Sequence, residues 1–135
     1  MPAPTVHPPS SGIPTPAEWS EAAIRGFQMM AAAWGLTTAE QLILLGEPSR
    51  SAFFAWKKSP VALSGDTLER ISYLLGIWKA LHNLIPDEPQ ALAWMRKPND
   101  HVLFGGKAPL EKLLQGRMLD LADVRRMLDA RMGVW

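Results

Sequence analysis

The sequence contains no cysteine among its 135 residues. This absence excludes disulfide bonds, thiolate catalysis and most structural zinc sites, and it fits a reducing cytosol. No apolar run reaches the roughly 18 residues of a membrane-spanning helix. The first residues also lack the basic and then apolar pattern of a secretory signal. We therefore expect a cytoplasmic protein that has no membrane partner.

An excess of charge is missing too. The 14 Lys and Arg residues nearly balance the 13 Asp and Glu residues, which leaves a formal net charge of +1. A surface that is basic as a whole is therefore excluded. Any binding of nucleic acid must depend on a local patch of cations.

Motifs of catalysis are absent as well. His7, His82 and His101 are scattered along the chain and follow no metal-ligand spacing. No Gly-x-Ser-x-Gly nucleophile motif occurs, and the stretch from Phe104 to Pro109 lacks the spacing of a phosphate-binding loop. We expect no catalytic residue, no metal site and no cofactor, and hence a protein that is not an enzyme.

Hydrophobic residues, by contrast, make up 47% of the chain and include six Trp, which is enough for a packed core. Their spacing is helical and no strand is convincing, so we predict an all-α fold. Residues 1–16 differ, because they hold six of the twelve prolines and no Asp, Glu, Lys or Arg. Since proline lacks a backbone donor, we predict a disordered leader there, or an arm that becomes ordered on a partner.

The first predicted helix follows this leader. Thr15 suits its cap, Pro16 its first position and Glu18 the capping box, and Gly35 suits its end. Apolar residues at spacings of three and four predict one buried face, made of Trp19, Ala23, Phe27, Met30 and Trp34.

Three further helices are predicted before the prolines at 86 and 89. Thr38 is the expected cap of the second helix, which stops at Gly46, and Ser49 caps a third helix over residues 50–58. A long helix over residues 68–84 follows. Pro86 and Pro89 then mark a hinge between two halves.

The second and third predicted helices resemble a helix-turn-helix of the Xre type. Such a pair lays its second helix in the major groove of DNA. The outer face of that helix carries three cations and no acid, and the predicted DNA-binding residues are Ser49, Arg50, Ser51, Phe54, Lys57 and Lys58. A helical pair that builds only the core, with a solvated basic face, is the alternative.

Roles within this face follow from position along the helix. Residues at the start of a recognition helix reach base edges, so Arg50 and Ser51 are the expected base readers. Lys57 and Lys58 lie at the other end, where phosphates are the expected contacts. Phe54 suits a thymine methyl group or a sugar.

The C-terminal part carries the more specific pattern. A helix ends at Pro98-Asn99, a loop closes on Gly105-Gly106, a short helix begins at Pro109 and stops at Gln115-Gly116, and a final helix covers residues 119–132. This string resembles the C-terminal domain of the Xre/MbcA/ParS antitoxins. The resemblance covers roughly residues 25–135.

The resemblance implies a function by binding. In that family the N-terminal half binds operator DNA and represses its own operon, and the C-terminal half binds a RES-domain toxin that consumes NAD⁺. It also implies a homodimer within a larger toxin–antitoxin complex. We expect a leader at residues 1–16, a helix-turn-helix domain at 17–86 and a toxin-binding domain at 87–135.

The final helix supplies the expected toxin contacts. A toxin cleft that holds a dinucleotide pyrophosphate favours positive charge, and the predicted toxin-binding residues are Arg125, Arg126, Arg131 and the terminal Trp135. The alternative is that these arginines are ordinary solvated residues of the helix. The alternative function is a transcriptional regulator whose C-terminal domain serves only dimerisation or ligand sensing.

Overall fold

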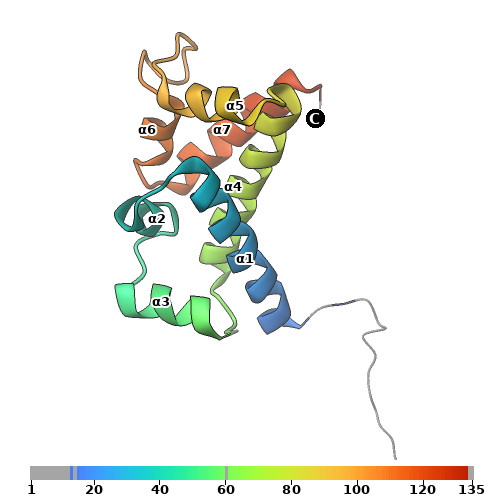
Figure 1. Ribbon diagram of the computed structural model, residues 1–135, viewed down its shortest axis with the longest axis vertical. Helices are drawn as coiled ribbons and strands as arrows, with labels where there is room; N and C mark the ends of the chain where they lie inside the picture. The colour runs from blue at the N-terminus through green and yellow to red at the C-terminus, as the bar shows by residue number, and fades with distance from the viewer. Residues whose placement is uncertain (1–12, 14, 60, 134–135) are drawn as a thin grey trace, which may run out of the picture.

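The computed structural model describes residue 13 and residues 15–59 and 61–133 (Figure 1). The described residues form seven helices and no strand, which confirms the predicted all-α fold. The helices are α1 (Pro16–Trp34), α2 (Thr38–Leu44), α3 (Arg50–Lys58), α4 (Gly65–Leu84), α5 (Glu88–Arg96), α6 (Pro109–Leu113) and α7 (Met118–Arg131). The predicted leader lies almost wholly outside the described residues, and so does Trp135.

Side-chain caps set where the first helices begin. Thr15 and Glu18 form the predicted capping box at the start of α1. The expected cap of α2 is wrong by one residue, because Thr37 takes that place and pairs reciprocally with Glu40. A glutamate three residues after Thr37 fixes this register, since its carboxylate accepts the cap residue's own N–H.

The buried face of α1 differs from the predicted one. Trp19 is 58% exposed, whereas Ser20 next to it is buried. The Ser20 hydroxyl accepts a hydrogen bond of 2.8 Å from the backbone N–H of Leu63, which satisfies the polar group inside the core. The face that packs inward therefore starts at Ser20 and continues with Ile24, Phe27, Met30, Ala31 and Trp34. Trp19 and Ala23 lie at its edge.

The central helix α4 joins the two halves of the molecule. It packs against α1 on one side and against α7 on the other (Figure 1). Ile71, Leu74 and Ile77 of α4 are fully buried, and so are Leu121 and Val124 of α7. One continuous core thus crosses the expected boundary between residues 86 and 87.

The arrangement of the helices separates two surfaces. Helix α3 lies at one end of the molecule, and the loop between α5 and α6 lies at the other (Figure 1). In the part of the chain that the structure describes, no helix has both the length and the apolar composition needed to cross a membrane.

Candidate functional site

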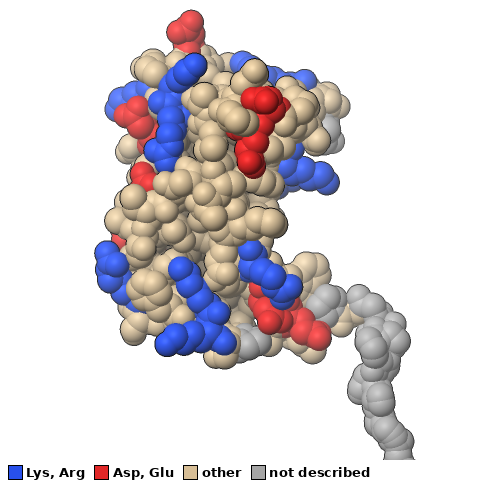
Figure 2. Space-filling model, in the orientation of Figure 1, with Lys and Arg blue, Asp and Glu red and all other residues tan. Residues whose placement is uncertain are grey.

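The outer face of α3 is the first candidate surface. All six predicted DNA-binding residues are exposed, whereas Phe53 of the same helix is 2% exposed within the core. Figure 2 shows several Lys and Arg side chains at the end of the molecule that carries α3, and others at the opposite end. The structure therefore brings the predicted cations together on a surface that a large partner can reach.

Two side chains of this face, those of Ser49 and Lys57, contact neighbouring residues. The Ser49 hydroxyl accepts a hydrogen bond of 3.1 Å from the Ala52 N–H, so Ser49 acts as the helix cap. The Lys57 ammonium lies 4.4 Å from the ring centroid of Phe53 and 5.2 Å from that of Phe54. Such cation–π contacts restrain the lysine while leaving its charge at the surface.

The turn before α3 has an unusual backbone. Gly46 has a φ of 88° and Glu47 a φ of 65°, two successive residues in the left-handed region. The conformation costs a non-glycine residue roughly 1–2 kcal/mol. The Glu47 N–H donates to the Leu42 carbonyl at 2.7 Å, which partly offsets this cost. The turn determines the direction in which α3 leaves α2.

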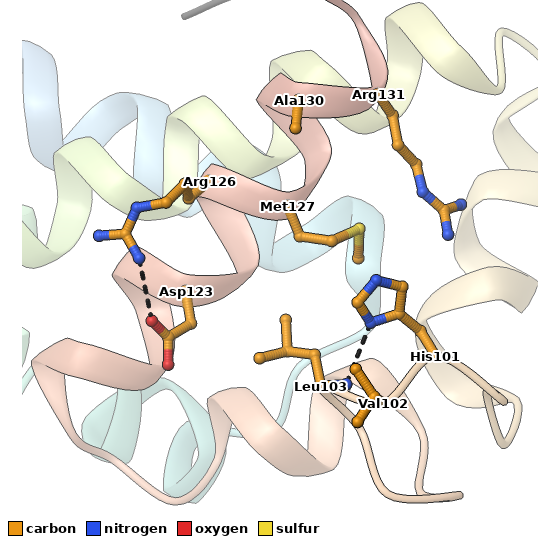
Figure 3. A pocket seen from close by; sticks show the side chains of 8 residues that line it. All are labelled: His101, Val102, Leu103, Asp123, Arg126, Met127, Ala130 and Arg131. Atoms are coloured by element: carbon orange, nitrogen blue, oxygen red, sulfur yellow. Dashed lines mark hydrogen bonds and ion pairs between the residues drawn. The ribbon is translucent and has the colours of Figure 1, made fainter.

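A groove at the other end of the molecule is the second candidate surface. It lies between the loop after α5 and helix α7 and has a volume of about 720 Å³. Its lining residues, drawn in Figure 3, are His101, Val102, Leu103, Asp123, Arg126, Met127, Ala130 and Arg131. Val102 is 89% exposed, so nearly all of its side chain is available to a partner. The groove therefore combines apolar side chains with two arginines and the carboxylate of Asp123.

Short-range hydrogen bonds hold the loop that forms one wall of this groove. The Asn99 side-chain oxygen accepts from the His101 N–H at 2.8 Å, and His101 Nδ1 accepts from the Leu103 N–H at 3.0 Å (Figure 3). The Phe104 ring is buried edge-on against Trp94 at 5.9 Å. The Pro-Asn and Gly-Gly string thus builds a fixed loop that presents Val102 to solvent.

The three arginines predicted on the last helix occupy different places. Arg126 is 71% exposed and pairs with Asp123 at 3.3 Å, and Arg131 is exposed at the opposite end of the groove (Figure 3). Arg125 instead lies across α4, where its guanidinium covers Gly76. The structure therefore unites two of the predicted arginines on one groove.

Arg125 is held in place by contacts within the fold. It donates to the Ser72 carbonyl at 3.4 Å and to the Asp129 carboxylate at 3.2 Å, and its side chain is 36% exposed. These contacts connect α7 to α4. Arg125 thus has fewer free donors for a partner than Arg126 has.

A buried carboxylate fixes the start of α7. The Asp120 side chain is 2% exposed and accepts hydrogen bonds of 2.8 Å from Lys112 and of 2.8 and 3.1 Å from Arg117. Burial opposes its ionisation, yet these two cations hold the pKa of Asp120 below its usual value. Lys112 also lies 3.8 Å from Asp123, the partner of Arg126. The network thus extends from α6 to the rim of the groove.

Several residues of the groove were not predicted from the sequence. His101, Val102, Leu103 and Met127 carry no motif of a binding site, and the loop reads as a structural turn. The sequence does not separate Val102, which is exposed, from Phe104, which lies between the same turn signals and is buried.

Comparisons with known proteins identify two domains along the chain. The model of the antitoxin Xre-like helix-turn-helix domain matches residues 21–76, which include α2 and α3. The model of the antitoxin Xre/MbcA/ParS C-terminal toxin-binding domain matches residues 80–133, which include the groove. The chain is also 44% identical over 126 residues to the uncharacterized protein y4oB of Sinorhizobium fredii, an alignment that covers 93% of this chain and 92% of the relative.

The two matched domains occur in the order that the sequence predicts. The first includes α3 at one end of the molecule, and the second includes the residues of the groove at the other. Proteins with these domains typically act by binding rather than by catalysis. The chain belongs to the Xre/MbcA/ParS family of antitoxins, with an Xre-like helix-turn-helix domain followed by a toxin-binding domain.

Proposed function

We propose that this antitoxin neutralises a RES-type, NAD⁺-consuming toxin through its C-terminal groove and represses its own operon through α3. The observation that carries the proposal is the placement of the two surfaces at opposite ends of one rigid helical core. A toxin seated on the groove then leaves α3 free. One chain is therefore able to hold both partners at once.

The groove suits a toxin that binds a dinucleotide. Its apolar lining residues Val102, Leu103 and Met127 are available for burial, and apolar surface removed from water is the main source of affinity. Arg126 supplies a guanidinium on an exposed rim. A cleft built for a pyrophosphate attracts such a group, and arginine is frequent among residues that dominate interface energies.

The face of α3 suits DNA. Arg50 stands at the first position of the helix with an exposed side chain, where a recognition helix reads bases. Lys57 and Lys58 stand in its last turn and meet phosphates. The net charge of the whole chain adds little, so the interaction depends on this patch.

A homodimer completes the proposal. One helix-turn-helix contacts a half-site, and two half-sites about one helical turn apart supply the remaining affinity. A groove of about 600 Å³ between α1 and α4 is lined almost entirely by apolar side chains, with Trp19 exposed at its edge. We assign this surface to the second copy, because the start of α1, which contributes Pro16 and Trp19 to it, lies at the same end of the molecule as α3.

Co-expression with the product of the adjacent reading frame tests the proposal. The antitoxin is expected to restore growth that the toxin stops, and to appear with it in a pull-down. In vitro, titration of the antitoxin into the purified toxin is expected to stop NAD⁺ consumption. An adjacent product that neither binds nor consumes NAD⁺ would contradict the assignment to RES toxins.

A further inference from the structure

Arg70 of α4 lies where three segments that are distant in the sequence meet. Its side chain is only 12% exposed, which is low for an arginine. Its Nη1 donates to the Gly116 carbonyl in the turn between α6 and α7 at 2.8 Å, and its Nε donates to the Asp66 carboxylate at 3.1 Å. Two anchors therefore hold the plane of the guanidinium.

The guanidinium held in this way fills the space behind the turn between α2 and α3. A Cβ atom on Gly46 would lie 2.9 Å from Arg70 Nε, so the turn and the arginine are in close contact. The turn between α6 and α7 also approaches α2 directly, because a Cβ on Gly116 would lie 3.4 Å from Ile43 Cγ2. The C-terminal half thus supports the turn that precedes α3.

That turn needs such support. Glu47 holds a left-handed backbone, which a non-glycine residue keeps only where its surroundings fix it. A change of φ at Gly46 or Glu47 would swing α3 as a unit, since the turn is the only covalent connection between α2 and α3. Recognition of bases tolerates little displacement of the helix that carries the reading side chains.

We propose that Arg70 is a positioning residue for the recognition helix, through which the toxin-binding half sets the affinity for DNA. This inference rests on the proposed binding of DNA by α3. Arg70 does not itself meet a phosphate, because its side chain is only 12% exposed and its Nε and Nη1 groups donate to Asp66 and Gly116. The two halves of the antitoxin are then not independent modules.

The test uses the full chain with Arg70→Gln and Arg70→Lys. The probe is a duplex from the region upstream of the antitoxin's own reading frame, and binding is measured by fluorescence anisotropy over a series of salt concentrations. We expect Arg70→Gln to bind about tenfold more weakly, the size of effect that a lost hydrogen bond of a charged group gives. Arg70→Lys should lose less affinity, because its ammonium keeps the positive charge and can still donate to one of the two anchors.

Two further readouts separate positioning from other roles. The slope of affinity against salt should stay unchanged in Arg70→Gln, whereas loss of a phosphate contact would reduce it by about one. Hydrogen exchange of the Glu47 amide, which donates to Leu42, should accelerate. Both are measured at a temperature where circular dichroism shows each variant folded.

Arg96→Gln is the matched control. Arg96 also connects the halves, since it donates to the Trp34 carbonyl at 2.9 Å, but it does not touch the turn before α3. It should bind DNA within about twofold of the unmodified chain. Equal losses in both variants, or an unchanged affinity in Arg70→Gln, would overturn the inference. If the unmodified chain binds no DNA, the proposed function fails instead, and the exchange rate of Glu47 still tests the role of Arg70.

Discussion

Arg125 and Arg126 are neighbours in the sequence, yet the structure predicts opposite consequences for their replacement. Arg125→Ala removes two hydrogen bonds and the cover over Gly76. Because the Ser72 contact is long and the side chain is partly exposed, we expect a loss of about 1 kcal/mol in the free energy of unfolding. The affinity for the toxin should stay within about twofold.

Arg126→Ala should do the reverse. Its ion pair with Asp123 joins a side chain that is 71% exposed, and exposed pairs contribute at most about 1 kcal/mol. The free energy of unfolding of Arg126→Ala should therefore be nearly unchanged. An arginine at the edge of an interface that enters a cleft contributes roughly 1–2 kcal/mol to binding, which corresponds to a loss of about 5- to 30-fold in affinity.

The assay for this pair combines thermal unfolding with inhibition. Unfolding by circular dichroism gives the stability of each variant, and titration into the toxin with NAD⁺ consumption as readout gives the inhibition constant. Deletion of residues 125–135 is a poorer test, because it removes Leu128, which is 1% exposed in the core. Weaker inhibition by Arg125→Ala together with unchanged inhibition by Arg126→Ala would refute the assignment of the groove.

Three further predictions concern the other surfaces and the buried carboxylate. Arg50→Ala should weaken binding to the operator duplex by about 1–3 kcal/mol and relax the preference at one base pair. An unchanged affinity with intact helix content would show that another face reads the DNA. Trp19→Ser should shift a dimer towards monomer in light scattering without loss of helix content, because Trp19 is already 58% exposed, and an unchanged mass would place the dimer contact elsewhere. Asp120→Asn should lower the free energy of unfolding at pH 7 by roughly 1–3 kcal/mol. Folding lowers the pKa of Asp120, so its ionised form stabilises the fold at pH values above the ordinary carboxyl range. This stabilisation is lost as the pH falls through the folded-state pKa, and the unmodified chain and Asp120→Asn should then become equally stable in acid. A constant difference between them across that range would contradict this reasoning.

Local chemistry made much of the fold predictable from the sequence. Thr15 with Glu18, Gly35 and Ser49 mark helix ends through hydrogen bonds within four residues, and all of them act as expected. The limits of the helices depend on such short-range contacts. The wrong cap predicted for α2 also depends on short-range contacts. Thr37 and Thr38 are each followed three residues later by a side chain that can complete a capping box, Glu40 and Gln41, and the structure uses Glu40.

Tertiary contacts explain what the sequence did not reveal. Trp19 has the right spacing for the apolar face of α1, but the buried position goes to Ser20, whose partner Leu63 is 43 residues away. The same applies to Arg125, whose place on α4 depends on the absence of a side chain at Gly76. The groove around Val102 forms only when the loop after α5 meets α7.

Growth rescue by matched variants tests the central claim most directly. The adjacent reading frame is expressed alone, with the unmodified antitoxin, with Arg126→Glu and with Arg25→Glu, a control at an exposed arginine of α1 that lies outside the groove. The proposed function predicts toxicity alone, full rescue by the unmodified chain and by Arg25→Glu, and reduced rescue by Arg126→Glu at equal protein level. Full rescue by Arg126→Glu, or no rescue by the unmodified chain, would contradict toxin neutralisation through the C-terminal groove.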